Sequence, residues 1–328
     1  MSDLQALPTF ADVAAAAERL GRVVRATPLL ESEALNALVG GRVLLKAEPL
    51  QHTGSFKLRG AYNAISQSAA PAVVAYSSGN HAQGVARAAR LLGRQATVVM
   101  PSDAPAIKIA NTRADGAQVR LYDRHRESRE AIGAEIAART GAVLIRPYDD
   151  PQIIAGQGTV GLELAEQARA AGAIPDAALI PCGGGGLIAG CSLALAELCP
   201  GIAIHAVEPA AFDDTRRSLA AGARVGNPEG GRSICDALLV PTPGELTFAL
   251  NRHLLAGGLV ASDAEVRRAL AFAFAHLKLV VEPGGAVALA ALLAGAFDAR
   301  GRTVAVVLSG GNVDAALFAE ALGEQAAG

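Results

Sequence analysis

Short apolar runs recur along this chain of 328 residues, and longer amphipathic segments lie between them. The runs, many of them rich in β-branched residues, predict strands at 42–48, 72–77, 96–100, 118–122, 142–146, 177–182, 203–208, 258–262 and 303–309. The alanine-rich segments predict helices at 80–92, 105–114, 127–139, 156–171, 187–198, 263–277 and 314–323. Because strands and helices alternate, we expect an α/β protein with mainly parallel sheets flanked by helices.

The number of predicted strands indicates two sheets rather than one, because a single sheet usually holds about five or six strands. No linker rich in Pro, Ser or charge divides the chain, so we expect two closely joined lobes with a cleft between them. In parallel sheets, ligands bind at the carboxyl ends of strands, where helices begin with unpaired N–H groups. The loops that follow the strands are therefore the places to look for a site.

Composition narrows the class of function. Apolar residues make up 51% and charged residues 18%, and the net charge is −2, so no basic surface for nucleic acid is expected. The start of the chain lacks the pattern of a signal peptide, and the apolar runs are too short to cross a bilayer. We therefore expect a soluble cytoplasmic protein without a membrane partner.

The spacing of the cysteines matches no zinc site and no CxxC pair, which predicts reduced thiols at Cys182, Cys191, Cys199 and Cys235.

Four glycines follow the predicted strand 177–182, in "CGGGGLIAG". Consecutive glycines let several backbone N–H groups converge on an anion such as phosphate. No Lys-Ser or Lys-Thr follows them, so this is not a nucleotide P-loop. Gly184, Gly186 and Ala189 also satisfy G-x-G-x-x-A, and Glu208 ends the next strand where a ribose-binding acid would stand. A nicotinamide-dependent oxidoreductase is therefore the competing class of enzyme.

Polar residues also follow the strands predicted at 72–77 and 303–309. After the first, "SSGNHAQGVA" begins a helix with short polar residues, which suits either ordinary capping or a pocket for a small carboxylate. After the second, "SGGNVD" places Ser309 beside two glycines, where its hydroxyl can hydrogen-bond a heterocyclic nitrogen. A plain turn in which Asn312 or Asp314 caps the next helix is the simpler interpretation of that segment.

Lys57 stands in "HTGSFKLRGA", among small and uncharged residues at a predicted helix start. An exposed lysine is ordinary, but a positive charge at that point opposes the helix dipole, so the amine loses its proton more readily. A neutral amine is what covalent bonding to a carbonyl requires. The histidines form no HxxxH or HxH pattern, and no G-x-S-x-G motif occurs. The leading interpretation is therefore an enzyme in which Lys57 forms a covalent bond and the glycine loop binds phosphate. The alternative is a non-catalytic amino-acid-binding module, which would tolerate loss of Lys57.

Together these loops resemble the fold-type II family of pyridoxal-phosphate enzymes, and within it the threonine/serine dehydratase and serine racemase branch. Nearly the whole chain takes part, because "TPLLES", "LLKAEPLQHTGSFKLRGA", "SSGNHAQGVA", "PYDDPQIIAGQGTVGLEL", "PCGGGGLIAG", "VEPGGA" and "LSGGNVD" follow the family's order. The resemblance implies open, mainly parallel twisted sheets in two lobes, as in the tryptophan synthase β-like fold, with the cofactor in the cleft. It also implies a large domain at 1–68 and 149–328 and a small substrate-side domain at 69–148.

The resemblance also implies roles for individual residues. The cofactor would be pyridoxal 5'-phosphate, held covalently by Lys57 with Phe56 beside its ring. Asn80 would reach the ring hydroxyl, and Ser309 would face the pyridine nitrogen. The residues that would hold the phosphate are Gly183, Gly184, Gly185 and Gly186. Those that would surround the substrate carboxylate are Ser77, Ser78, Gly79 and His81.

The implied reaction is the dehydration and deamination of a β-hydroxy amino acid to a 2-oxo acid and ammonia, with the freed amine of Lys57 as general base. L-Threonine and L-serine are the expected substrates, and hydroxyaspartate and phenylserine are alternatives. Because Ser309 offers a neutral hydroxyl, it leaves the pyridine nitrogen less protonated than a carboxylate would, which favours elimination over transamination. Ser78 matches the serine that acts as the opposite-face acid or base in racemases, so an amino-acid racemase is the close alternative.

Three further expectations come from the resemblance. Glu208, Asp214 and the backbone carbonyl of Phe212 match positions at which relatives bind a divalent cation, magnesium or calcium; two solvated acids are the other interpretation. Residues 235–237 are Cys-Asp-Ala where many dehydratases have Ala-Asp-Gly, so the wall next to the substrate is expected to differ. The family's habit predicts a homodimer or homotetramer.

Overall fold

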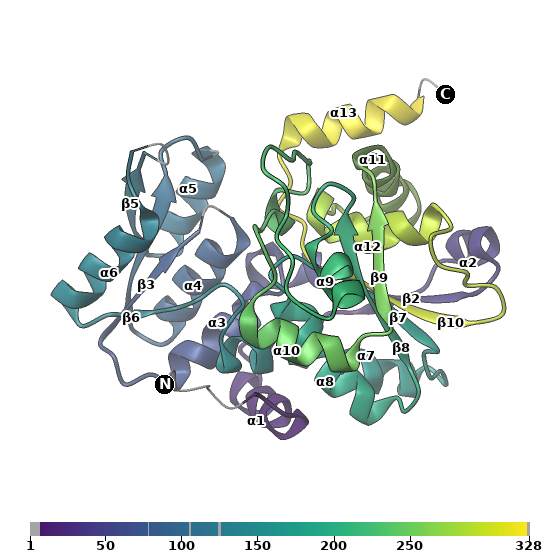
Figure 1. Ribbon diagram of the computed structural model, residues 1–328, viewed down its shortest axis with the longest axis horizontal. Coiled ribbons are helices and arrows are strands. Elements are labelled where there is room, and N and C mark those ends of the chain that lie inside the picture. The colour runs from purple at the N-terminus through teal and green to yellow at the C-terminus, as the bar shows by residue number, and fades with distance from the viewer. Residues whose placement is uncertain (1–6, 78, 105, 124–125, 327–328) are drawn as a thin grey trace.

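Two sheets organise the chain, and Figure 1 shows them side by side with helices packed around each. The computed structural model describes residues 7–77, 79–104, 106–123 and 126–326. Within these ranges the larger sheet has six strands in the order β1-β2-β10-β7-β8-β9. Its neighbouring strands are parallel except for β1 and β2. The strands are β1 (Leu29–Leu30), β2 (Arg42–Ala47), β10 (Thr303–Leu308), β7 (Ala177–Pro181), β8 (Ala203–Pro209) and β9 (Gly257–Ala261).

The smaller sheet comes from the middle of the first half of the chain. Its four strands within the described ranges are all parallel, in the order β5-β4-β3-β6. They are β3 (Ala72–Tyr76), β4 (Gln95–Pro101), β5 (Gln118–Tyr122) and β6 (Val143–Leu144). This sheet and its helices form the blue lobe on the left of Figure 1. We refer to the two parts as the larger-sheet and smaller-sheet lobes.

Helices cover both faces of each sheet. In the first half of the chain they are α1 (Phe10–Leu20), α2 (Glu33–Val39), α3 (Lys57–Ser66), α4 (Asn80–Leu91), α5 (Ala106–Ala114), α6 (Arg129–Thr140) and α7 (Pro151–Ala170). In the second half they are α8 (Gly186–Leu198), α9 (Asp214–Ala221), α10 (Glu245–Leu254), α11 (Asp263–Phe272), α12 (Pro283–Leu293) and α13 (Ala315–Ala326). A π-helical turn (Ala273–Leu277) continues α11, and 3-10 turns lie at Glu48–Leu50, His52–Gly54 and Asp236–Leu238.

The hydrophobic core follows from the alternation of side chains along the strands. In β10, Val304 and Val306 pack with α11 and α12, whereas Ala305 and Val307 face α7 and α8 on the other side. In the smaller sheet, Val73 and Ala75 likewise pack against α3 and α4. Central strands are thus apolar on both faces, as is typical of parallel sheets.

Helices α7 and α8 cross in contact through glycines. A Cβ added at Gly190 would lie 2.2 Å from the carbonyl oxygen of Ile154 and 2.5 Å from the nitrogen of Gly158. No side chain larger than hydrogen fits there without moving one helix. This close contact fixes how α8, which follows the loop after β7, lies against α7.

A buried ionic network supports the start of α3. Arg59 donates hydrogen bonds to both oxygens of Glu48, at 2.8 and 2.9 Å, and to both oxygens of Glu163, at 2.6 and 3.0 Å. Lys46 also pairs with Glu163, at 2.7 Å. The two cations balance the two carboxylates, so the network can lie in the core without an unpaired charge.

The expected α/β class with two mainly parallel sheets is confirmed. The helix predicted at 156–171 begins earlier, at Pro151, where Asp150 caps it. The stretch 263–277 is α-helical only to Phe272. The pattern missed α12, whose sequence "PGGAVALAALL" is buried all round and so lacks an amphipathic period. The domain boundaries at 68/69 and 148/149 stay a prediction.

A helix can cross a membrane only if it is long and apolar enough. Of the helices in the described ranges, none combines the length and the apolar character needed to cross a bilayer.

Candidate active site

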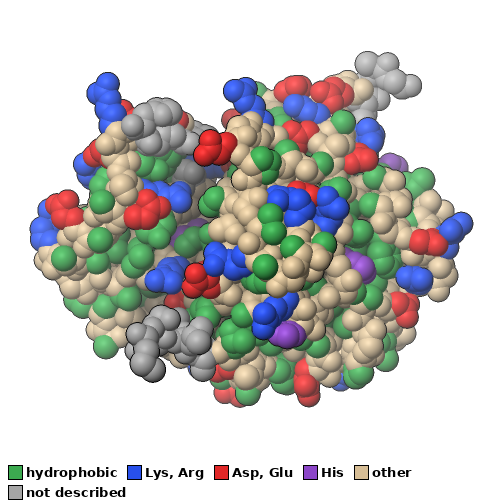
Figure 2. All heavy atoms as spheres, viewed as in Figure 1, with side chains coloured by type: hydrophobic (Ala, Val, Ile, Leu, Met, Phe, Trp, Pro, Cys, Tyr) green, Lys and Arg blue, Asp and Glu red, His purple; other side chains and the backbone are tan. Residues whose placement is uncertain are grey.

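A cavity of about 630 Å³ lies between the two lobes. The surface is hollowed there in Figure 2, with Lys and Arg side chains near the hollow. The structure brings most of the predicted site residues to its wall, from four separate segments of the chain. They are Phe56, Lys57, Ser77, Gly79, Asn80, His81, Gly183, Gly184, Gly185, Gly186 and Ser309. Ser78, predicted as an acid or base, lies outside the described residues.

Lys57 is the first residue of α3 and is partly buried in the cavity wall. Its Nζ donates a hydrogen bond to the carbonyl oxygen of Pro147 at 2.8 Å and lies 5.1 Å from the centre of the Phe56 ring. Burial lowers the pKa of the amine to about 8, although the nearby carboxylate of Glu282 opposes that shift. An amine with this pKa is neutral in a sizeable fraction of molecules near pH 8, as a nucleophile or general base must be.

Ser309 and the Lys57 segment are hydrogen-bonded into one wall. Ser55 forms an isolated antiparallel bridge with Gly310, and the amide of Phe56 donates to the carbonyl of Ser309 at 3.3 Å. Ser309 is 4% exposed and lines the cavity. A buried hydroxyl in that position can serve a ring nitrogen without adding charge to the site.

The glycine loop joins the end of β7 to the start of α8. Gly185 has a φ of +90°, which side-chain-bearing residues rarely adopt. A Cβ at Gly184 would lie 2.3 Å from the ring of Tyr148, and one at Gly185 would lie 2.9 Å from Thr247 and Asn251. Only glycines therefore leave this loop in place, at a helix N-terminus that attracts anions. The loop fits a phosphate group.

The smaller-sheet lobe contributes the N-terminus of α4. The amide of Gly79 donates to Oγ of Ser77 at 3.3 Å, and a Cβ at Gly79 would meet no atom of the described, non-adjacent residues within 4 Å. His81 donates from Nε2 to the carbonyl oxygen of Ile145 at 2.9 Å. Burial and the positive charge of Lys57 lower the pKa of His81 to about 3, so its ring is neutral. An anion here would be held by backbone N–H groups and the helix dipole rather than by a histidine cation.

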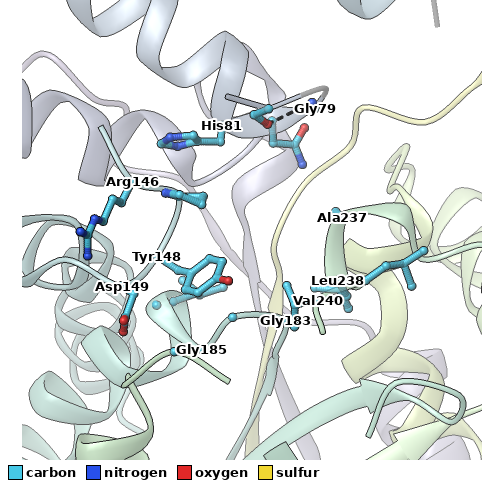
Figure 3. Close-up of a pocket in the computed structure, with 18 of the residues that line it drawn as sticks. Gly79, His81, Arg146, Tyr148, Asp149, Gly183, Gly185, Ala237, Leu238 and Val240 are labelled. Carbon is cyan, nitrogen blue, oxygen red and sulfur yellow. Dashed lines mark hydrogen bonds between the residues drawn. The ribbon is translucent and has the colours of Figure 1, made fainter. Parts of the chain in front are cut away.

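Several residues that line the cavity were missed in the sequence. Pro147 and Tyr148 precede α7, and Figure 3 shows Tyr148 between His81 and the glycines Gly183 and Gly185. They were missed because "RPYDD" looks like an ordinary loop before a capped helix. Glu282 was missed for the same reason, because an acid next to "PGG" looks like the ordinary negative charge near a helix start.

The rest of the wall carries charge from both lobes. Lys108 of α5 donates to Asp236 at 2.6 Å across the lobe boundary. Arg129, at the start of α6, places its guanidinium 5.2 Å from the centre of the Tyr76 ring and donates from Nε to the exposed Glu130. Ala237, expected to alter the wall, lines the cavity, and Figure 3 shows it across from Tyr148.

Glu208 and Asp214 lie at the end of β8 and the start of α9, away from the lining of the cavity. Oε1 and Oε2 of Glu208 accept from the amides of Thr215 and Arg216, both at 2.8 Å. Oδ2 of Asp214 is buried and has no hydrogen-bond partner among the residues that the structure describes. Burial, and then the neighbouring Asp214, raise the pKa of Glu208 to about 8. In the part of the chain that the structure describes, no group of three or more His, Cys, Asp or Glu side chains is placed to hold a metal.

Comparison with known proteins agrees with this geometry. The family described as pyridoxal-phosphate dependent enzyme matches residues 20–310. The L-threo-3-hydroxyaspartate ammonia-lyase of Pseudomonas sp. is 43% identical over 320 residues, which cover 96% of this chain and 99% of that protein. The serine racemase of Schizosaccharomyces pombe is 38% identical over 328 residues, covering 99% and 100%. The solved threonine deaminase of T.th. has a TM-score of 0.88 and 46% identity, covering 94% of this chain and 99% of that one.

Proposed function

Because the chain belongs to the family of pyridoxal-phosphate dependent enzymes, and its relatives are ammonia-lyases and racemases, we propose that it eliminates water from a β-hydroxy amino acid. The observation that carries this proposal is the amine of Lys57, partly buried, with a pKa of about 8, beside a glycine loop suited to phosphate. The products would be a 2-oxo acid and ammonia.

The residues divide the work of binding. Lys57 would hold the cofactor covalently, residues 183–186 would hold its phosphate, and Ser309 and Asn80 would contact its ring. When bound, pyridoxal phosphate accepts the electrons that remain at the substrate α-carbon after a proton is removed. The backbone N–H groups of residues 79–81 would hold the substrate carboxylate at the N-terminus of α4.

Proton transfer falls to Lys57. Once freed from the cofactor, its neutral amine would accept the proton from the α-carbon. The same amine would then give that proton to the β-hydroxyl, which would leave as water. The unsaturated amine that is released reacts with water to give the 2-oxo acid and ammonia. Ser309 supports elimination over transamination, because a neutral hydroxyl does not stabilise a protonated pyridine nitrogen as a carboxylate would.

For the substrate we propose 3-hydroxyaspartate first. Arg129 supports this choice: its guanidinium lies on Tyr76 at the cavity wall, and among the described residues its two terminal nitrogens have no hydrogen-bond partner. A second carboxylate on the substrate would suit those donors. L-Threonine is the second choice, because Ala237 and Leu238 form an apolar part of the wall on which its methyl group could pack, and L-serine, which lacks that methyl, follows it.

A substrate panel tests this proposal. Purified protein should absorb visible light, borohydride should bleach that absorbance, and Lys57→Ala should abolish it. 3-Hydroxyaspartate, L-threonine, L-serine and phenylserine should be compared for release of 2-oxo acid and for change of chirality. Arg129→Gln should lower kcat/KM for 3-hydroxyaspartate by about tenfold or more while sparing serine. Change of chirality without 2-oxo acid would make the enzyme a racemase and the elimination proposal wrong.

A divalent cation at Glu208 and Asp214, with the carbonyl of Phe212, remains part of the proposal. Two adjacent buried carboxylates support it, one with an oxygen that has no partner in the described part of the chain, because a cation would offset their repulsion. Magnesium or calcium should then raise the unfolding temperature of the natural protein but not of Asp214→Asn. Equal shifts in both proteins would argue against the site.

A homodimer or homotetramer also remains a prediction, which sedimentation would test.

A further inference from the structure

Glu282 is a buried carboxylate in the cavity to which the proposed chemistry gives no role. It occupies the N-cap position of α12, yet its side chain makes no hydrogen bond to that helix. Instead, Oε1 accepts from Nδ2 of Asn80 at 2.5 Å. Glu282 is 2% exposed, and among the described residues Oε2 has no hydrogen-bond partner. The side chain therefore lies in the cavity wall instead of capping the helix that it precedes.

The contact with Asn80 is the end of a chain of hydrogen bonds with a fixed direction. The carbonyl of Thr53 can only accept, so Nδ2 of Asn312 donates to it at 2.8 Å. The same Nδ2 donates to Oδ1 of Asn80 at 2.7 Å, which leaves Nδ2 of Asn80 facing Glu282. Both ends of the Asn80 amide are thereby fixed, and one N–H remains for a ligand in the cavity.

The backbone conformation on both sides of this series of hydrogen bonds fits the positions of its members. Thr53 has a φ of +65°, which is strained for a β-branched residue, and that conformation goes with a carbonyl aimed at Asn312. A Cβ at Gly310 would lie 2.4 Å from Oε1 of Glu282, so the carboxylate packs directly on the backbone beside Ser309. The amide of Glu282 also donates to the carbonyl of Gly310 at 3.0 Å. Glu282 is therefore held against the same wall as Ser309.

Charge gives Glu282 a second task. Burial, and then the charge of Asp236, raise its pKa to about 7, while Asn80, Lys108 and Lys57 act in the opposite direction. In turn, Glu282 is the carboxylate that raises the pKa of Lys57 against the effect of burial. The charged groups that act on Glu282 are thus Lys57 of α3, Lys108 of α5 and Asp236 of the 3-10 turn before Leu239.

We propose that Glu282 is a positioning residue of the cofactor site, which orients the amide of Asn80 toward the ring hydroxyl and supplies the counter-charge for the protonated amine of Lys57. This rests on the cofactor site assigned above but not on the choice of substrate. Asn80 lies in the smaller-sheet lobe, whereas Glu282 and Asn312 lie in the larger-sheet lobe. The same contacts therefore hold the lobes together at the cofactor.

Three variants separate the two tasks. Glu282→Gln keeps an acceptor for Asn80 but loses the charge. Glu282→Asp keeps the charge but is too short to reach Asn80. Asn312→Ala removes the other anchor of the Asn80 amide. The exposed Glu229, outside the cavity, gives the matched control Glu229→Gln.

The measurement is the absorbance of the bound cofactor between pH 6 and 10, together with the cofactor dissociation constant. Glu282→Gln should move the midpoint of the absorbance titration to lower pH by about one unit, because the protonated Nζ of Lys57, now joined to the cofactor, loses its counter-charge. Glu282→Asp and Asn312→Ala should keep the midpoint but weaken cofactor binding about tenfold, the effect of one lost hydrogen bond. Glu229→Gln should change neither quantity.

Two results would overturn the proposal. One is a Glu282→Gln titration that coincides with that of Glu229→Gln. The other is cofactor binding by Glu282→Asp and Asn312→Ala as tight as in the natural protein. If Glu282→Gln does not fold, these two variants still decide whether Asn80 is positioned as described. If the natural protein shows no cofactor absorbance, the cofactor site itself is refuted. If only the proposed substrate is wrong, the titration midpoints and the cofactor dissociation constants stay as expected.

Discussion

Replacing Arg59 by methionine should destabilise the protein strongly, because it leaves a buried carboxylate without a cation. The guanidinium of Arg59 is fully buried and bonds both oxygens of Glu48 and both of Glu163. Lys46 would still pair with Glu163. Glu48, also fully buried, would keep only the hydroxyl of Thr27 at 2.6 Å as a side-chain partner among the described residues.

The expected loss is about 3–5 kcal/mol in the free energy of unfolding, the usual cost of removing one member of a buried pair. The matched control is Arg42→Met, which breaks a pair with Glu31 in which both side chains are more than one-third exposed. That change should cost about 0–1 kcal/mol. Urea unfolding followed by circular dichroism measures both variants under the same conditions.

A double variant tests the cause. If the unpaired charge is responsible, Glu48→Leu combined with Arg59→Met should be more stable than Arg59→Met alone, because the double change leaves no buried charge without a partner. The reasoning fails if Arg59→Met costs no more than Arg42→Met, or if the double variant loses the sum of the two single losses.

Three other changes follow from the structure. Gly190→Ala should lower the free energy of unfolding by about 3 kcal/mol or more, because its Cβ would overlap the backbone of α7. Its control, Gly323→Ala in the exposed part of α13, should be neutral or stabilising by up to about 1 kcal/mol. Thermal unfolding of both variants should show this order. Because the amine of Lys57, once freed from the cofactor, must be neutral to accept a proton and its pKa is about 8, kcat for elimination should rise with pH through about 8, and a flat profile from pH 6 to 10 would contradict this role. Thr247→Val removes the 2.7 Å hydrogen bond to the carbonyl of Gly184 and leaves that oxygen with only the longer bond from the amide of Gly244, at 3.4 Å, so cofactor binding measured by dialysis should weaken about tenfold.

The sequence was sufficient to predict those site residues that local pattern and side-chain chemistry both indicate. The glycine loop, Lys57 and Ser309 follow apolar strands or begin helices in polar segments, and the structure brings all three to one cavity. Their neighbourhood could be expected because the carboxyl ends of parallel strands share one edge of a sheet. Their roles toward the cofactor stay predictions.

The sequence was insufficient where function depends on distant partners. The contacts between Arg59 and Glu163 join residues 104 positions apart, and Asn80 and Glu282 are 202 positions apart. Nothing in the neighbouring residues distinguishes these buried acids from ordinary exposed ones. Helix α12 was missed for a related reason: a helix covered on every side shows no polar face from which its period could be recognised.

The N-terminus of α4 links the two kinds of binding in this site. Gly79, proposed to contact the substrate carboxylate, immediately precedes Asn80, which the larger-sheet lobe holds through Asn312 and Glu282. A shift of Asn80 would therefore move the amides that face the substrate as well as the group that faces the cofactor. For this reason Asn312→Ala should raise KM for the substrate as well as the cofactor dissociation constant, although Asn312 is not proposed to touch either ligand. Steady-state kinetics at saturating cofactor would test this: an unchanged KM would mean that the two ends of the α4 N-terminus act independently.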